Sequence, residues 1–507
     1  MKNDSIVIKA GRLSIDQYYI TVFLIASLII INSLAMNAPM ISLLLGTCQT
    51  MYLLYVLITK DVMKVTLTTV VLLSANIENG MFALGDREAI FYTMYKLPVL
   101  RGYHLLLIMM FAIVWYYRKG MLSLSALYGN NGYKKFISIN LIIAAMAMPA
   151  ALFSFLINDN GIRAHTDMWR YMARDAYQMI YIIVIICMVS FSLKCDRKFI
   201  ERVKELSIAI LSATTWAAVV LIISGNYYTN WGTEYYLTCP LILFFSPGLI
   251  LFLYEEHGIF NLITGGVALL LQLRYTVGIA GTWWLYIFLV VIVFFKRAIV
   301  FQGRLKKLII RFISFSVLIT GAILALQSGI LDNVSGQVTY KLSSILDVFQ
   351  NSNGLRAGYN ASGGSIQVRV EEMINALIEI VTKPYYLPFG KGYGGTVLHH
   401  WGGSNWNISG STFSDVMIKY ETYSAFHIPI AEIIVNFGFF GIVLIIQVLK
   451  EFISEFLKKE GNVFIMIGCM WFMTFYSLYY SFNLGVVWMC CGLYSKYNNG
   501  ARKGMNY

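Results

Sequence analysis

The chain has 507 residues, of which 58% are hydrophobic and 13% charged, and its mean hydropathy is +0.66. A water-soluble protein needs more charge to cover its surface, so the composition excludes a soluble enzyme or binding protein. In a soluble protein the net charge of +13 would suggest nucleic acid as a partner. In a membrane protein such a charge reflects the lysines and arginines that set topology, so we expect no nucleic-acid partner.

Apolar segments recur along nearly the whole chain. Lys2, Lys9 and Arg12 precede the first of them without a small-residue cleavage site after it, so we expect an uncleaved first helix. We predict an all-α integral membrane protein, a polytopic bundle of about 12–14 transmembrane helices of roughly 20 residues each. The candidate spans are 18–36, 39–58, 65–77, 103–117, 136–157, 179–193, 206–224, 237–254, 259–273, 279–295, 308–326, 428–449, 463–480 and 484–494.

The distribution of positive charge predicts the topology. If the spans alternate from a cytoplasmic N-terminus, 26 of the 39 lysines and arginines lie on the inner side. Cytoplasmic loops carry such an excess, which places both termini in the cytoplasm. The predicted organisation is a bundle of about 11 helices over 1–326, a large extracytoplasmic loop over 327–427, and C-terminal helices with a cytoplasmic tail over 428–507.

The large loop is rich in Gly, Ser and Asn, and a loop of this length is uncommon unless it has a function. Within it, residues 366–382 are predicted to form an amphipathic helix that Pro384 ends, with Glu372 and Glu379 on its polar side and Arg369 at the border. We expect its apolar side to pack on the membrane domain. That side comprises Ile366, Val370, Met373, Ile374, Leu377, Ile378 and Val381.

Two further segments of the loop contain residues that bind phosphate or metal in other proteins. Gly390-Lys-Gly-Tyr-Gly394 lacks the strand before it and the helix after it that a phosphate loop requires, so we interpret it as a flexible glycine turn. His399 and His400 are adjacent and have no obvious third ligand. The sequence therefore predicts no metal and no cofactor.

A spaced pattern links the loop to the span that follows it. Arg369 and the amphipathic helix are followed by two prolines and the glycine-rich segment, and His427 then opens a span. The remaining members of the pattern are Pro384, Pro388, Gly438 and Gly441. This layout resembles the superfamily of O-antigen ligases and Wzy-type polymerases of bacterial polysaccharide assembly. Arg274, at the outer end of the ninth span, resembles an arginine that these proteins carry, and the resemblance covers 274–441.

Two positions depart from the ligase pattern. Ile428 follows His427 where the ligases have Asn, Ser or Gln, and Met373 stands where they have Leu. These departures favour the polymerases over the ligases within the superfamily.

The resemblance implies a metal-independent membrane glycosyltransferase. It would join oligosaccharide repeat units linked to undecaprenyl diphosphate into O-antigen or capsular polysaccharide, on the outer face of the bacterial inner membrane. Arg274 and Arg369 would bind the diphosphate, because arginine stays charged and binds phosphate oxygens bidentately. His427 would act as the base for the acceptor hydroxyl, with Glu432 orienting it or replacing it. The expected partners are the lipid-linked donor and acceptor and the bilayer, and a chain-length regulator protein is a candidate partner.

Other residues of the predicted outer loops suit the same substrates. Arg163, Arg170 and Arg174 cluster within 158–178, where they would contact diphosphate or anionic sugar, or pair with Asp167 and Asp175. The aromatic residues of the large loop would stack on sugar rings, or mark the membrane interface as aromatic residues often do. They are Trp401, Trp406, Tyr420 and Tyr423.

Two alternative functions remain open from the sequence. One is the ligase that transfers the finished chain to lipid A core. The other is a transporter or flippase for the same lipid-linked sugars, which would bury charged residues in the middle of the membrane. The predicted spans contain few such residues.

Overall fold

The computed structural model describes the larger part of the helical regions and a part of the large loop. The described residues are 15–35, 38–59, 61–75, 131–159, 168–195, 198–225, 227–230, 234–237, 258–275, 365–401, 421–423, 426, 429–458, 465–466, 468–469 and 482–503. At some helix positions, among them Arg170, Arg274 and Arg369, the description covers the backbone alone.

Most of the described residues are helical, as the apolar segments predict. Four helical segments are long and apolar enough to cross a membrane by length and composition: Asp16–Ala35, Tyr133–Leu156, Phe199–Ile223 and Ile430–Leu457. The helices found at predicted spans are α2 (Ile15–Ala35), α3 (Pro39–Ile58), α4 (Val62–Ser74), α8 (Asn131–Leu156), α9 (Met168–Cys195), α10 (Phe199–Ile223), α12 (Gly258–Tyr275), α19 (Pro429–Leu457) and α21 (Phe482–Lys503). The predicted spans 103–117, 279–295 and 308–326 lie outside the described residues, as do 237–254 and 463–480 almost entirely.

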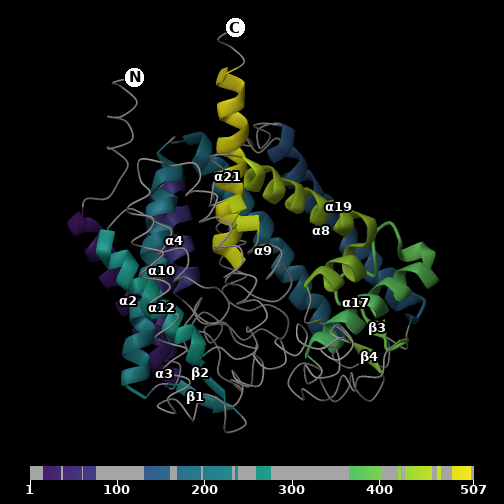
Figure 1. Ribbon diagram of the computed structural model, residues 1–507, viewed down its shortest axis with the longest axis horizontal. Helices are drawn as coiled ribbons and strands as arrows, with labels where there is room; N and C mark the ends of the chain where they lie inside the picture. The colour runs from purple at the N-terminus through teal and green to yellow at the C-terminus, as the bar shows by residue number, and fades with distance from the viewer. Residues whose placement is uncertain are drawn as a thin grey trace, which may run out of the picture.

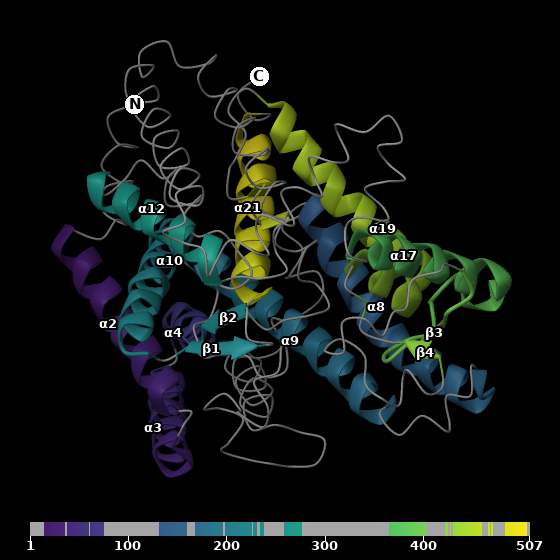
Figure 2. The same ribbon diagram turned by 60° about the horizontal axis from the view of Figure 1, so that its bottom comes forward.

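The helices form two groups joined through the middle of the molecule (Figure 1). In one group α2 packs against α10, and α10 packs against α12. In the other, α8 packs against α19. Helices α9 and α21 lie between the two groups in both views (Figures 1 and 2), and α9 contacts α4, α8 and α21.

Neutral hydrogen bonds hold the interior of the first group. The buried Tyr18 hydroxyl lies 3.0 Å from both Ser212 Oγ and Asn261 Oδ1, which joins α2, α10 and α12. Trp216 Nε1 donates to Thr264 Oγ1 at 3.1 Å. Polar side chains between apolar helices associate well when they satisfy one another in this way.

Short strands accompany the helices. Strands β1 (Tyr227–Asn230) and β2 (Glu234–Leu237) pair antiparallel, with Tyr227 opposite Leu237. In the large loop, β3 (Val397–Leu398) pairs antiparallel with β4 (Thr422–Tyr423). The second pair lies beside α17 in both views (Figures 1 and 2).

The predicted amphipathic helix is present as α17 (Ser365–Thr382), and η3 (Pro384–Tyr386) follows it at the predicted proline. Helix α17 packs against α19 and β3. A buried cluster joins them and contains Ala376 of α17, Val397 of β3, Tyr423 of β4, Phe426, and Ala431 and Val435 of α19. The described part of the large loop is therefore packed on the helices that flank it.

Candidate functional site

The glycine-rich segment after α17 binds α19 at the point where that helix is interrupted. Gly438 has φ 53° and ψ −132°, which breaks the helix into two parts. Such a break leaves carbonyl groups of the preceding turn without their helical donors. The carbonyls of Val435 and Asn436 instead accept from the backbone N–H groups of Lys391 and Gly392, at 2.7 and 3.0 Å.

Helix α19 also donates a backbone hydrogen bond to the residues just before the glycine-rich segment. The N–H group of Phe439, directly after the break, donates to the carbonyl of Leu387 at 2.7 Å. A Cβ at Gly438 would lie 2.5 Å from both Gly390 N and Leu387 O, so the close approach requires glycine there as well as the positive φ. Gly441 allows a second close contact, with the backbone of Ile433 on the other side of the break. A Cβ at Gly441 would lie 2.5 Å from the carbonyl oxygen of Ile433.

The glycine-rich segment is equally tight against α8. Gly392 has φ 78°, and a Cβ there would lie 2.2 Å from both Ala147 O and Ala151 N. Tyr393 donates its backbone N–H to Ala147 O at 3.3 Å. The prediction of a flexible turn at 390–394 is therefore wrong. Its glycines serve a buried backbone-to-backbone contact, which local sequence does not distinguish from a mobile turn.

The polar side of α17 is buried, whereas the predicted apolar side is buried only in part, with Met373 packed against the buried clusters. Glu371, Glu372, Asn375 and Glu379 are completely buried, whereas Val381 is 73% exposed. Two other members of the predicted apolar stripe, Val370 and Leu377, are also exposed. We predicted that the apolar side packs on the membrane domain, and for these residues that prediction is wrong.

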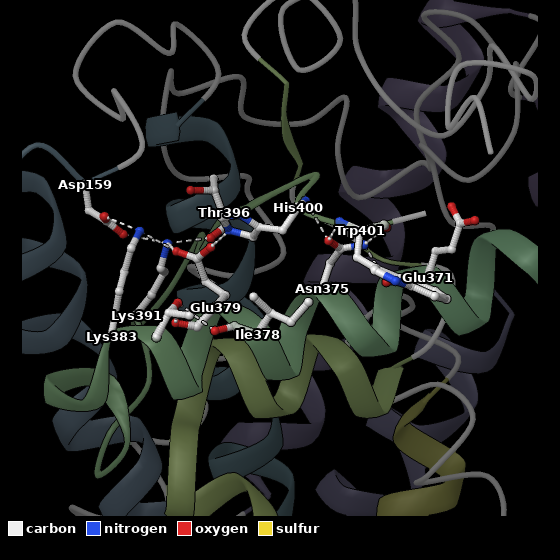
Figure 3. A network of polar contacts seen from close by, with 11 residues as sticks. Asp159, Glu371, Asn375, Ile378, Glu379, Lys383, Lys391, Thr396, His400 and Trp401 are labelled. Atoms are coloured by element: carbon white, nitrogen blue, oxygen red, sulfur yellow. Dashed lines mark hydrogen bonds and ion pairs between the residues drawn. The ribbon is translucent and has the colours of Figure 1, made fainter. Parts of the chain in front are cut away.

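A cluster of charged side chains fills the space between the end of α8, α17 and the glycine-rich segment (Figure 3). Lys391 is fully buried, and its Nζ lies 2.6 Å from both Asp159 Oδ2 and Glu379 Oε1. Lys383 Nζ lies 2.5 Å from Asp159 Oδ1 and 2.6 Å from Glu379 Oε1. Lys391 also donates to the Thr396 carbonyl at 2.8 Å. The two lysines and two carboxylates balance in charge, which is how buried charges are tolerated.

The cluster fixes the ionisation of its carboxylates. Burial disfavours the charged form of Glu379, but Lys391, Lys383 and a hydrogen bond with His400 outweigh burial and lower the pKa of Glu379 to about 2. The same competition between burial and the two lysines lowers the pKa of Asp159 below its usual range. Burial opposes the charge of Lys383, but its hydrogen bonds to the two carboxylates raise its pKa. Both carboxylates are therefore ionised at neutral pH.

The second carboxylate oxygen of Glu379 faces the segment after β3, in which His400 and Trp401 are partly exposed. His400 Nε2 lies 2.8 Å from Glu379 Oε2. The Asn375 side chain holds the backbone: its Oδ1 accepts from the N–H groups of His400 and Trp401 at 2.7 and 2.8 Å, and its Nδ2 donates to Trp401 O at 2.8 Å. His399 faces away toward Glu371, at 3.7 Å. Among the described residues no group of three or more His, Cys, Asp or Glu could hold a metal ion.

The structure describes some of the predicted site residues fully and others in part. Glu432 is buried in the first turn of α19, and Gly438 and Gly441 make the contacts given above. Arg369 lies in α17 and Arg274 in the last turn of α12, where the backbone alone is described. Arg163 and His427 lie outside the described residues.

The described residues next to Arg369 and His427 in the chain share one buried cluster. Arg369 is one helical turn before Met373, which packs against the buried cluster of Ala376 and Ala431. His427 directly follows Phe426, a member of that cluster. Helix α12, which carries Arg274, lies in the other helix group, across α9 and α21 from α17 in both views (Figures 1 and 2).

Arg170 lies in the first turn of α9, which begins at Met168 inside the stretch predicted to be an outer loop. Farther along α9, the buried carboxylate of Asp175 accepts from the backbone N–H of Gly394 at 2.8 Å and from Asn436 Nδ2 at 3.1 Å. Pairing with Asp175 was one of the two roles predicted for the arginines of that stretch. The structure shows that Asp175 links the glycine-rich segment to α19.

The charged cluster was missed from the sequence. Glu379 and Lys383 have the i, i+4 spacing of a helical ion pair, which is a usable signal. Asp159 and Lys391 are more than two hundred residues apart, and no local pattern connects them. The sequence-based interpretation of Lys391 as part of a loose turn left it without a role.

Comparison with known proteins does not assign the chain to a family. The chain matches no family model, no curated protein and no solved structure.

Proposed function

We propose that this membrane protein is a glycosyltransferase that polymerises oligosaccharide repeat units carried on undecaprenyl diphosphate, on the outer face of a bacterial inner membrane. One observation carries the proposal. The glycine-rich segment is hydrogen-bonded to the interrupted helix α19, and α17 joins both by packing on α19 and by the ion pair of Glu379 with Lys391. These are the segments whose spacing resembles the polysaccharide polymerases, so the spacing has a physical reason in this chain.

The chemistry follows from the donor. The transferred sugar leaves a lipid diphosphate, whose charge requires cations at the membrane surface, and we assign that role to Arg369 near the start of α17. Arg274, Arg163 and Arg170 are further candidates for binding diphosphate. His427, with Glu432 one turn into α19, acts on the acceptor hydroxyl. The donor already contains the energy of the new bond, so no nucleotide or metal is required.

The proposal favours polymerase over ligase through Ile428, which departs from the ligase pattern. A transporter is the alternative of a different class. Glu205, Glu432, Glu451 and Glu455 are buried within candidate spans, more than the sequence led us to expect. Two of them, Glu451 and Glu455, pair with Lys496 at 2.6 and 3.1 Å. These buried carboxylates keep transport of the same lipid-linked sugars as the second candidate.

The test uses purified protein in liposomes with a lipid-diphosphate-linked repeat unit as donor and acceptor. Wild type should give a ladder of polymer on the lipid carrier. Arg369→Ala and His427→Ala should leave single repeat units, and Arg369→Lys should retain part of the activity because it keeps the charge but loses bidentate binding.

Other outcomes separate the alternatives. Transfer of polymer to added lipid A core, without elongation, would identify a ligase. Movement of the lipid-linked unit across the bilayer without a new glycosidic bond would identify a transporter. Full ladders from Arg274→Ala, Arg369→Ala and His427→Ala alike would refute the assignment of these residues.

A further inference from the structure

The segment that leaves β3 presents two side chains on a rigid backbone. The side chain of His400 is 31% exposed, and Trp401 is 47% exposed. Their backbone groups are held by three hydrogen bonds from the buried Asn375 side chain (Figure 3). Side chains on a backbone held in this way lose little freedom when a ligand binds, which favours affinity.

The contact with Glu379 determines which nitrogen of His400 carries the proton. Glu379 is ionised, so its carboxylate oxygens can only accept hydrogen bonds. Nε2 of His400, 2.8 Å from Glu379 Oε2, is therefore the protonated nitrogen. In the neutral ring the free lone pair is then on Nδ1. A carboxylate that orients a histidine and stabilises its cation is the arrangement that prepares a histidine to accept a proton.

Among the described residues, the other charged groups near His400 belong to the charged cluster and to Glu371. Lys383 and Lys391 contact the other carboxylate oxygen of Glu379, and Asp159 lies beyond them. On the neighbouring side, Glu371 faces His399. The lysines keep Glu379 anionic without contacting the ring themselves, so Glu379 is the charged group that acts on His400.

We propose that His400 and Trp401 form the subsite for the acceptor sugar, with Trp401 stacking on the sugar ring and His400 Nδ1 receiving the proton of the attacking hydroxyl. The inference rests on the proposed function and makes it more specific. The acceptor oxygen bonds to the anomeric carbon of the donor, and its proton moves to Nδ1. The bond from the anomeric carbon to the phosphate oxygen breaks, and its electron pair leaves with the lipid diphosphate. The imidazolium that results is stabilised by Glu379, which acts as a positioning residue.

The segment of the subsite packs against residues that precede His427 in the chain. His399 packs edge-on against Tyr423, with ring centroids 6.4 Å apart, and Val397 shares a buried cluster with Tyr423 and Phe426. His427 follows Phe426 directly in the chain. The described contacts thus bring the segment of His400 to the segment that leads into His427, which leaves His427 to bind the acceptor or the diphosphate.

The main variant is His400→Gln, whose amide can still donate to Glu379 but has no basic nitrogen. We expect it to lower the turnover number by roughly a hundredfold or more, the usual contribution of a general base. Wild-type activity should fall as the pH is lowered, because a protonated base cannot accept the proton of the hydroxyl, and this fall should be absent from the residual activity of His400→Gln. His399→Ala is the matched control and should keep both the rate and the pH profile.

Two further variants separate positioning from stacking. Glu379→Gln should change the pH profile, because an amide no longer stabilises the imidazolium. Trp401→Ala should raise the KM for acceptor more than it lowers turnover, and Trp401→Phe should restore the KM in large part. Thermal unfolding in detergent identifies any variant that has lost its fold. If a variant of His400 or Glu379 fails to fold, the proposal is tested by Trp401→Ala and Trp401→Phe, because Trp401 is exposed.

The outcomes distinguish the two proposals. Wild-type protein that forms no glycosidic bond from the lipid-linked donor would end the proposed function. Wild-type protein that polymerises, together with folded His400→Gln that keeps the full rate and pH profile, would overturn the inference alone. An unchanged KM in Trp401→Ala would equally overturn the stacking role.

Discussion

The two helix groups of this protein satisfy their buried polar groups in different ways. In the group of α2, α10 and α12, the neutral side chains of Tyr18, Ser212 and Asn261 hydrogen-bond one another between the helices, and Glu205 of α10 is a buried carboxylate outside that contact. In the group of α8, α17 and α19, charged side chains meet in the interior, and Lys391 and Glu379 are completely buried. Neutral pairs hold helices together at little electrostatic cost, whereas buried charges are costly unless every one is paired. The charged group is therefore where we expect function, and removal of a single charge should affect it most.

The largest effect should come from Lys391→Met, which leaves Glu379 and Asp159 with Lys383 as their remaining lysine partner. Breaking a buried ion pair on one side costs about 3–5 kcal/mol of unfolding free energy. The measurement is unfolding in detergent, by heat or denaturant. Lys204→Met is the control, because Lys204 pairs with Glu201 where both side chains are partly exposed, at 28% and 36%, and such surface pairs contribute about 0–1 kcal/mol. Equal stability of the two variants would contradict the role of the charged cluster.

Gly438→Ala should be the next most destabilising change. It adds a positive-φ penalty of about 1–2 kcal/mol and a backbone clash of about 1–3 kcal/mol with Gly390 and Leu387. Gly225→Ala is matched in φ but has no atom within 4 Å of the new Cβ, so it should carry the first penalty alone. Similar losses for both variants would show that the contact between the glycine-rich segment and α19 contributes little.

Acid should destabilise the charged group before the neutral one. The pKa of Glu379 is lowered from an ordinary 4.5 to about 2, so its stabilising contribution is complete above about pH 4.5 and is lost as the pH falls toward 2. The pKa of Asp159 is also lowered, so its stabilising contribution is likewise lost in acid. We expect the Tm to decrease over this range in wild type and to depend less on pH in Glu379→Gln. Identical pH dependence in the two proteins would be inconsistent with the ionised carboxylate.

The smallest effect should come from the neutral group. Tyr18→Phe removes one hydroxyl between α2 and α10 and should cost about 1 kcal/mol, the usual net value of a neutral hydrogen bond. The loss measured for Tyr18→Phe, set beside that for Lys391→Met, gives the contrast between the two groups directly. A larger loss for Tyr18→Phe would reverse the comparison.

The architecture of the described helices follows from sequence pattern to a large extent. Long apolar segments predict helices because an apolar solvent leaves backbone groups no partner outside the helix. Pro384 ends α17 as expected. The direction in which α17 faces was predicted wrongly, because its period identifies two sides but not which side the rest of the protein covers. The count of spans, the positions of the termini and the side of the large loop remain predictions.

The candidate site was likewise predicted from the sequence only in part. The sequence alone determined that Arg369, a glycine-rich segment and a Gly-x-x-Gly helix follow one another at a characteristic spacing, because such spacing is a property of the chain. Only the tertiary structure decided that the N–H groups of Lys391 and Gly392 bind the carbonyls freed by Gly438, and that Asp159 and Glu379 enclose Lys391. Buried ion pairs between distant segments depend on how helices pack, and helix packing is not written in any local pattern of residues.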